Sequence, residues 1–180
     1  MADSTKQPDA TAPDIAAASD CRLEPRLQNR NALIYAANVS LIYLAAPALY
    51  VGFVQAGLCK HLHTSDTIAN LPSTRFLAMA WGPGVIAWLF PQARLLKKTL
   101  GFAYGLMAAM GAGVAAVLIA EPSSGLIIAA LMVHAAVLGA ANGVQNILSW
   151  EALDRGVSAR LRGKALGLAF GWGPGFAVIG

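Results

Sequence analysis

The sequence predicts an all-α membrane protein with about five transmembrane helices, arranged as part of a bundle with a three-plus-three inverted repeat. Composition is the first reason: 57% of the residues are hydrophobic, 12% are charged, and the mean hydropathy is +0.56. A soluble domain carries about twice that share of charge. The second reason is that the tetrapeptide Trp-Gly-Pro-Gly occurs at both 81–84 and 172–175, in the second and fifth apolar runs. Gly/Pro-interrupted segments at corresponding positions are typical of membrane proteins built from inverted repeats.

Five apolar runs define the expected spans, because about 20 apolar residues are needed to cross roughly 30 Å of hydrocarbon. The runs cover residues 32–58, 76–90, 100–120, 125–150 and 165–180. The second run needs flanking residues in order to span. The fifth gives only about 24 Å of helix at about 1.5 Å per residue, which is short of the hydrocarbon thickness. We therefore expect an incomplete bundle that ends inside a helix, and a complete five-helix protein with a short last helix is the alternative.

Residues 1–30 are expected to form a cytoplasmic tail, and residues 31–180 the transmembrane domain. Residues 1–20 are rich in Ala, Asp, Ser, Thr and Pro, contain no aromatic residue and show no periodic apolar face. Such a segment buries too little surface to order itself, so we expect the tail to be disordered. It does not read as a cleavable secretory signal, because the apolar run begins only at Ala32 and is far longer than a signal core.

Basic residues are concentrated before the first run and in two of the connections between runs, whereas the connection at 121–124 holds none. The positive-inside rule places the basic segments, and the N-terminus with them, in the cytoplasm. We therefore expect an integral protein of the bacterial inner (plasma) membrane. Its net charge of +4 is explained by these inner segments, so no nucleic-acid partner is expected. The basic residues are Arg22, Arg26 and Arg30, then Arg94, Lys97 and Lys98, then Arg155, Arg160, Arg162 and Lys164.

Polar side chains in the first and fourth runs are the candidate lining of a substrate cavity, because polar groups in hydrocarbon usually face a bundle interior or a watery cavity. In the fourth run, His134, Asn142 and Gln145 fall on one helical face at about 100° per residue. In the first run, Tyr35 and Asn38 share a face. Three alternatives stay open. Asn142 and Gln145 are solvated at a span end, His134 is a satisfied structural histidine, or Tyr35 only marks the interface.

Proline and glycine residues inside the runs are the candidate hinges. Proline cannot donate a backbone hydrogen bond and glycine tolerates close backbone approach, so both Trp-Gly-Pro-Gly copies are expected to distort their helices as equivalent gating elements. A kink at the proline of the first run fits gating and static curvature equally well. The hinge candidates are Pro47, Gly82, Pro83, Gly84, Gly173, Pro174 and Gly175.

Small residues at four-residue spacing predict packing seams, because they let helix backbones approach closely. One seam is expected on the fifth run at Gly167, Gly171 and Gly175. Another is expected on the fourth run at Gly139 and Gly143, on the side away from the polar face. These seams bring helices together and carry no substrate specificity of their own.

Motifs of soluble enzymes are absent from the sequence. There is no glycine loop followed by Lys-Ser/Thr, no His-Glu-x-x-His and no carboxylate pair within the runs. The segment 59–63 carries Cys and His side chains able to bind metal, but its spacing matches no structural zinc pattern. We therefore expect no enzymatic activity, no cofactor and no metal site.

Two stretches carry a resemblance to a known family. The connection after the second run, Leu89–Lys98, places Arg94, Lys97 and Lys98 where that family has Gly-x-x-x-Asp-Arg-x-Gly-Arg-Arg, although the glycines and the aspartate are replaced. The stretch 162–167, Arg-Gly-Lys-Ala-Leu-Gly, leads into a Gly/Pro-rich fifth run. With these features, residues 31–180 resemble the N-terminal half of a major facilitator superfamily transporter, hence five of its usual twelve spans.

The resemblance implies a fold and an activity. In that family spans one and four line the central cavity, spans two and five move against the other half, and span three is peripheral. It implies a secondary transporter that moves a small solute across the lipid bilayer by alternating access. It also implies a protein partner, either a missing C-terminal half or a second copy through self-association. A small oligomeric pore and a membrane-embedded assembly factor without transport activity are the alternatives.

The expected topology is tested by thiol labelling of intact cells in a background where Cys59 is replaced by Ala. Cys21 and a Lys97→Cys variant should be protected from a membrane-impermeant reagent added outside, whereas a Ser123→Cys variant should react. Labelling of positions 97 and 123 from the same side would contradict the five-span topology.

Overall fold

The computed structural model describes residues 23–49, 52–82, 84, 95–120 and 122–179, and within these ranges the secondary structure is entirely helical. The all-α expectation is therefore confirmed. The helices are α1 (Pro25–Leu49), α2 (Phe53–His61), α3 (Asp66–Ala80), α5 (Leu96–Ile119), α6 (Ser124–Gly156) and α7 (Ala159–Ile179).

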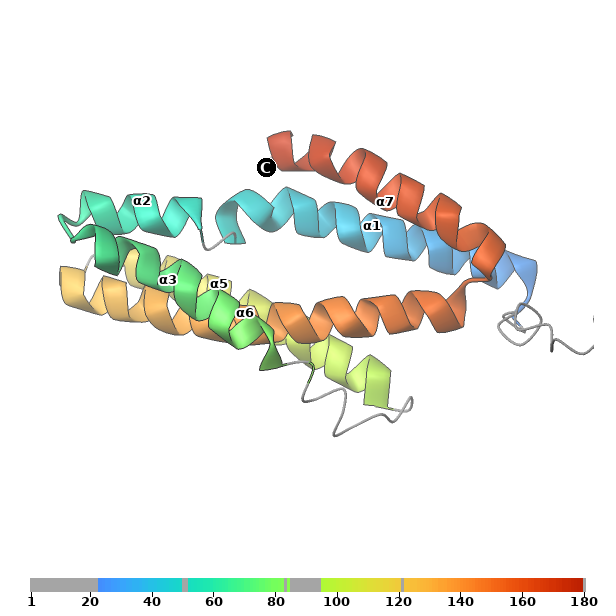
Figure 1. The fold of residues 1–180 in the computed structure, drawn as a ribbon, viewed down its shortest axis with the longest axis horizontal. Helices are drawn as coiled ribbons and strands as arrows, with labels where there is room; N and C mark the ends of the chain where they lie inside the picture. Colours follow the sequence, from blue (N-terminus) through green and yellow to red (C-terminus); the bar gives the residue numbers. More distant parts are fainter. Residues whose placement is uncertain (1–22, 50–51, 83, 85–94, 121, 180) are drawn as a thin grey trace, which may run out of the picture.

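The helices form two groups that meet along α6 (Figure 1). In one group α7 packs along the length of α1. In the other, α3 and α5 both pack against α6, which is the longest helix, and α2 packs against α3. The contacts of α6 with α1 and α7 are much less extensive. The helix α1 consequently makes few contacts with α3, α5 and α6.

Two of the described helices are long and apolar enough to cross a membrane. They are α5 and α6, whose most apolar 18-residue windows both have a mean hydropathy of 2.0. Only 11% of the α5 window is buried inside the structure, against 44% for α6. A core helix of a soluble protein would be mostly buried, so the exposed apolar surface of α5 favours contact with lipid. These two candidate spans favour a membrane protein, and they correspond to the third and fourth apolar runs.

The other three runs differ from the expected boundaries. The first run is divided between α1 and α2 instead of forming one helix. The second run begins inside α3, which starts at Asp66 because the Ser65 hydroxyl accepts a hydrogen bond from Ile68 N at 3.4 Å and caps the helix. Residues 66–75 are thus helical and not an external connection. Residues 85–90 of that run lie outside the described residues.

The fifth run begins earlier than expected. The helix α7 starts at Ala159 and contains 21 residues, or about 31 Å at about 1.5 Å per residue. The helix is therefore longer than expected, but it is not among the described helices that are both long and apolar enough to cross a membrane. Its first turns hold the basic residues that the sequence pattern assigned to a loop, namely Arg160, Arg162 and Lys164.

The two Trp-Gly-Pro-Gly copies do not occupy equivalent local structures. In the first copy, Trp81 is the C-cap of α3, Gly82 and Gly84 are helical, and Pro83 lies outside the described residues. In the second copy, Pro174 lies inside α7, which remains helical from end to end. The expectation of helices broken at matching places is wrong for the second copy. A proline inside a helix forfeits one hydrogen bond but does not have to end the helix when its neighbours pack well.

Hydrogen bonds from α1 fix the connection between α6 and α7. Asn31 Nδ2 donates to Gly156 O at 3.0 Å, and Ser158 N donates to Gln28 Oε1 at 3.2 Å. Arg162 Nε donates to Val157 O at 2.9 Å from the α7 side. These bonds explain why α1 is helical from Pro25, so that residues 25–30, expected in the tail, form its first turns. Residues 1–22 of the expected tail lie outside the described residues.

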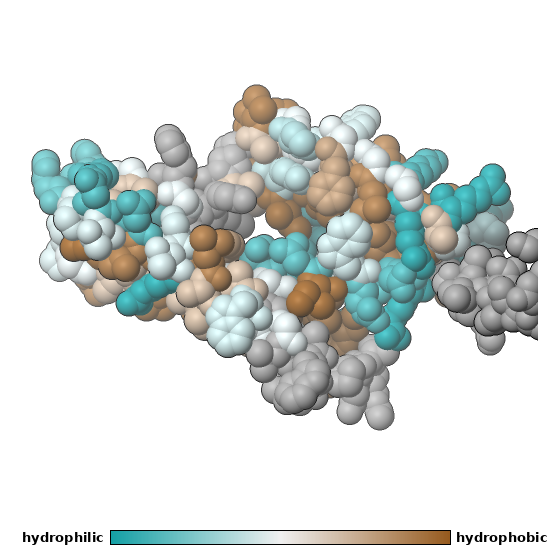
Figure 2. Space-filling model, in the orientation of Figure 1, coloured by the Kyte–Doolittle hydropathy of each residue, from teal (hydrophilic) through white to brown (hydrophobic). Residues whose placement is uncertain are grey.

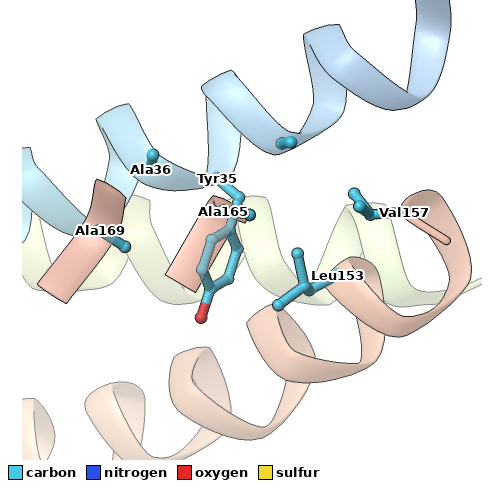
Figure 3. Close-up of a cluster of buried hydrophobic side chains, with 7 residues drawn as sticks. Tyr35, Ala36, Leu153, Val157, Ala165 and Ala169 are labelled. Carbon is cyan, nitrogen blue, oxygen red and sulfur yellow. The ribbon is translucent and has the colours of Figure 1, made fainter. Parts of the chain in front are cut away.

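A small-residue face joins α7 to α1, but it is not the expected one. Ala165, Ala169 and Gly173 are buried at four-residue spacing, and the two alanines belong to a cluster with Ala36 and Tyr35 of α1 (Figure 3). A Cβ added at the expected seam of Gly167, Gly171 and Gly175 would meet nothing within 4 Å. That seam lies two residues away, or about 200° around the helix, so the prediction of packing through it was wrong.

Two glycines allow the closest helix contacts. A Cβ at Gly139 of α6 would collide with the Phe76 carbonyl oxygen of α3 and would lie 3.0 Å from Phe76 Cα. A Cβ at Gly173 of α7 would collide with the ring of Tyr43 on α1 and would lie 3.1 Å from its Cγ. The packing role expected for Gly139 agrees with this contact. The α3–α6 and α1–α7 pairs therefore each have one glycine in tight contact with the neighbouring helix, against backbone at Gly139 and against a side chain at Gly173.

Hydrophilic residues gather mainly at the two ends of the molecule in Figure 2, with hydrophobic residues between them. At one end, Lys60 forms an ion pair with Asp66 across the α2–α3 connection. At the other, Arg155 pairs with Glu151 at 2.5 Å and Arg162 with Asp154 at 2.5 Å. Exposed pairs of this kind contribute little stability, so their value here is to mark the polar ends of the bundle.

The helix contacts predict opposite effects for matched glycine substitutions. Gly139→Ala should lower the free energy of unfolding by about 1–3 kcal/mol, because the backbone it meets cannot turn aside. Gly173→Ala should cost less, since the Tyr43 ring can move. Gly167→Ala, on the open face of α7, should leave stability unchanged or raise it by up to about 1 kcal/mol.

Thermal unfolding of the three purified variants in one detergent measures these effects. If Gly139→Ala and Gly167→Ala lowered the stability equally, the α3–α6 contact at Gly139 would not be tighter than the open face of α7.

Candidate functional site

A cavity of about 380 Å³ lies between α1, α5 and α6. This volume is at the lower end of the range for pockets that hold small ligands. Its polar lining is uncharged and consists of amides, phenols and one hydroxyl, and its remaining lining is aliphatic. The polar residues are Asn31, Tyr35, Asn38, Tyr104 and Ser149, and the aliphatic ones are Ile34, Leu100, Ala152, Leu153 and Val157.

Tyr35 and Asn38, both expected to line a cavity, contribute to this one from α1. Asn38 Nδ2 donates a hydrogen bond to the Tyr104 hydroxyl at 2.6 Å, which joins α1 to α5. The Tyr35 ring packs beside Leu153 and extends from α1 toward α6 in Figure 3. Its centroid lies 6.4 Å from that of Trp150, with the two rings tilted by 57°. Such a tilted aromatic pair is favourable and holds the phenol in place.

The end of the cavity nearest the α6–α7 connection is built by Asn31 and Val157. Val157 is 1% exposed and packs in the same cluster as Ala32 and Leu153. Because the Asn31 amide also bonds Gly156 O, this connection is tied directly to the cavity wall. A movement of Asn31 in the cavity wall would therefore act directly on the connection that leads into α7.

Gln145, a third expected cavity residue, stands behind the lining and not in it. Its side chain is 2% exposed, and its Nε2 donates to the Ser149 hydroxyl at 3.0 Å. Ser149 is the residue that lines the cavity. Asn142 lies one turn earlier on α6, is partly buried, and is not among the lining residues. The solvated alternative does not hold for Gln145, because that side chain is buried.

His134, the fifth expected cavity residue, belongs to a different part of the bundle. It is 3% exposed, and its Nδ1 lies 2.7 Å from Nε2 of Gln55, a residue of α2 that is 4% exposed. The two side chains are hydrogen-bonded, and the direction of the bond depends on the tautomer of the imidazole. His134 and Gln145 are eleven positions apart, or about 16 Å along α6. His134 therefore links α2 to α6, away from the cavity.

The hinge candidates fall in varied surroundings. Pro47 lies in the last turn of α1, which ends at Leu49. Gly173 is buried against Tyr43, whereas Gly82, Gly84 and Gly175 have open space around them. Of the expected basic motif, Lys97 and Lys98 are exposed in the first turn of α5, and Arg94 lies outside the described residues.

The cysteine and histidine segment considered for metal binding does not form a ligand cluster. Cys59 is fully buried and packs with Ala69 and Leu131 between α2, α3 and α6. Within the described ranges, no three Cys, His, Asp or Glu side chains come together as metal ligands.

Three residues of the polar framework were missed at the sequence level. Tyr104 was passed over because the family resemblance places the third span at the periphery, although it is the one tyrosine in that apolar run. Ser149 and Gln55 were not among the expected cavity residues. The available signal was that each polar residue inside a run needs a partner on another helix.

Comparisons with protein-family models, with curated proteins and with solved structures found no match for this chain. The likeness to the major facilitator superfamily consequently rests on the sequence features described above, and any function has to be argued from the geometry of the cavity.

Proposed function

We propose that this chain is a multi-pass membrane protein of the secondary-transporter type, which moves a small solute by alternating access. The observation that carries the proposal is the uncharged polar cavity between α1, α5 and α6. It is lined by residues of the first, third and fourth apolar runs, and these include Tyr35 and Asn38. Polar lining inside an otherwise apolar bundle is the usual mark of a substrate pathway in membranes.

The surface of the molecule supports a membrane location. The apolar α5 is mostly exposed, with Phe102 at 71% and Ile119 at 82%. Residues so exposed are costly in water and favourable in hydrocarbon. The ion pairs and most basic side chains of the described residues lie near the ends of the helices, and the exception is Arg75, which is exposed in the interior of α3. We propose that α1 with α2, α3, α5, α6 and α7 correspond to the five expected spans, with the N-terminus in the cytoplasm of a bacterial cell.

The pairing of helices supports an inverted repeat. In a three-plus-three repeat, span one is equivalent to span four, and span two to span five. The extensive contact between α1 and α7 joins spans one and five, and that between α6 and α3 joins spans four and two. The symmetry of the repeat relates these two contacts, because it maps span one onto span four and span five onto span two. Each also has a tight glycine position, Gly173 in one and Gly139 in the other.

The same pairing suggests which parts move. The helix α3 packs mainly on α6, and α7 packs mainly on α1. Each pair can therefore move as a unit. The connection between α6 and α7, tied to Asn31, would transmit a change in the cavity to α7. Alternating access also needs a second wall. We propose that a further transporter half or a second copy of this chain supplies it.

Transport is tested with the purified protein in proteoliposomes, using a panel of radiolabelled uncharged solutes and an empty-vesicle control. Uptake should saturate with solute concentration. Asn38→Leu should lower the initial rate about tenfold or more, because a paired polar group of the cavity wall is lost.

The matched control is Asn70→Leu, the same substitution on the exposed side of α3, which should leave uptake unchanged. Flux that never saturates would instead favour an oligomeric pore. Uptake that is absent for every solute, in protein that is folded and monodisperse, would contradict a transport role.

A further inference from the structure

We infer that the cavity between α1, α5 and α6 selects a small uncharged molecule that carries both hydrogen-bond donors and acceptors on an apolar body. This names the solute class of the proposed transporter, and to that extent it rests on the proposed function. The inference comes from the direction of each hydrogen bond that the cavity wall already makes.

The two amides on α1 are oriented by bonds through their nitrogens. Asn31 Nδ2 donates to Gly156 O at 3.0 Å, and Asn38 Nδ2 donates to the Tyr104 hydroxyl at 2.6 Å. A backbone carbonyl can only accept, so the Asn31 amide cannot be reversed without losing its bond. Neither amide oxygen accepts a hydrogen bond within the described part of the chain. The α1 wall therefore offers two oriented acceptors, Asn31 Oδ1 and Asn38 Oδ1.

The hydroxyls on the facing helices are oriented in the opposite sense. The Tyr104 oxygen accepts the bond from Asn38, and the Ser149 oxygen accepts one from Gln145 Nε2. A hydroxyl that accepts from the protein still has its hydrogen to donate. The α5 and α6 walls therefore offer two donors, Tyr104 O–H and Ser149 O–H. A ligand that satisfies both walls needs donors toward α1 and acceptors toward α5 and α6.

The buried Gln145 orients the Ser149 hydroxyl. The Gln145 side chain is 2% exposed and its Nε2 donates to the Ser149 oxygen, while its own Oε1 is buried without a hydrogen-bond partner among the described residues. Gln145 is thus a positioning residue, which acts on the ligand only through Ser149.

Charge and size restrict the ligand further. Among the residues that the structure describes, no Lys, Arg, Asp, Glu or His lines the cavity, so an ionised ligand would lose its hydration without gaining a counter-ion from them. The cavity volume of about 380 Å³ admits a small molecule only. The aliphatic lining, including Ile34, Leu100 and Leu153, suits an apolar body. An organic amide, or a hydroxyl-bearing molecule of similar size, meets all of these conditions.

Binding of isosteric probes to the detergent-purified protein tests the inference without requiring transport. The probes are benzamide, benzoate and benzamidine, which share one shape but are neutral, anionic and cationic at pH 7. A second series of acetamide, acetate and acetamidine repeats the comparison for a smaller body. Binding is followed by tryptophan fluorescence, because the Trp150 ring lies 6.4 Å from the ring of Tyr35, which lines the cavity, and a Trp150→Phe variant confirms the source of the signal.

The neutral member of at least one series should bind saturably and at least about tenfold more tightly than its charged counterparts. Tyr104→Phe, which keeps the ring and removes only the hydroxyl, should weaken binding about tenfold. Ser149→Ala should weaken it to a similar extent, and Asn70→Leu should have no effect. Tighter binding of a charged member, no binding of any probe, or binding that is indifferent to Tyr104→Phe would overturn the inference.

The two proposals fail in different ways. Preference for a charged probe together with saturable uptake would overturn the solute class and leave transport standing. Selective binding of the neutral probe without any uptake would sustain the cavity chemistry and contradict transport.

Discussion

The structure depends on one constraint: a polar group inside an apolar bundle has to find its partner within the chain. Burying an amide or a hydroxyl without a hydrogen bond costs roughly 1–3 kcal/mol by protein measurements, and more in hydrocarbon. The described helices meet this constraint in part: three hydrogen bonds cross their interfaces, whereas Gln55 Oε1 and Gln145 Oε1 are buried without a hydrogen-bond partner. Asn38 with Tyr104 joins α1 to α5, Gln55 with His134 joins α2 to α6, and Asn31 with Gly156 joins α1 to the α6–α7 connection. These bonds fix the lateral order of helices whose apolar surfaces would pack in many ways.

Close packing and polar pairing act at different places, and the cavity results from their separation. The tight contacts at Gly139 and Gly173 hold α6 to α3 and α7 to α1. Between these two pairs, α1 and α6 touch only lightly, and polar side chains bridge the remaining space. A site that is held by side chains from three helices can change shape when either pair moves. This is the property that an alternating-access mechanism requires.

Hydropathy and helical periodicity were enough to predict the parts of the fold that depend on composition alone. They predicted α5 and α6, and they placed Tyr35 and Asn38 together on one face of α1. They could not show at which position along the helix axis each polar side chain meets its partner. His134 and Gln145 share a face of α6 because eleven residues bring the helix back to nearly the same angle, but they lie about three turns apart and bond different partners, Gln55 and Ser149.

Partner shape was the other information missing from the sequence. Two stripes on α7 have the same spacing and similarly small residues, and only one of them packs. The ring of Tyr43 packs closely on Gly173, on the same face of α7 as the buried Ala165 and Ala169, whereas Gly167 and Gly171 lie on the open face. Boundaries failed for a similar reason. The Ser65 cap starts α3 early, and the bonds made by Gln28 and Asn31 extend α1 toward the N-terminus.

The central claim is that α1 pairs with α7 on one side of the cavity, and it is tested most directly by disulfide trapping in native membranes. In a Cys59→Ala background, cysteines replacing Ala36 and Ala169 occupy one buried cluster and should form a bond rapidly under mild oxidation. Cysteines replacing Leu33 and Gly171, on outward faces of the same two helices, should not. Trapping of the outward pair in preference to the buried pair would contradict the helix arrangement, and with it the cavity that depends on that arrangement.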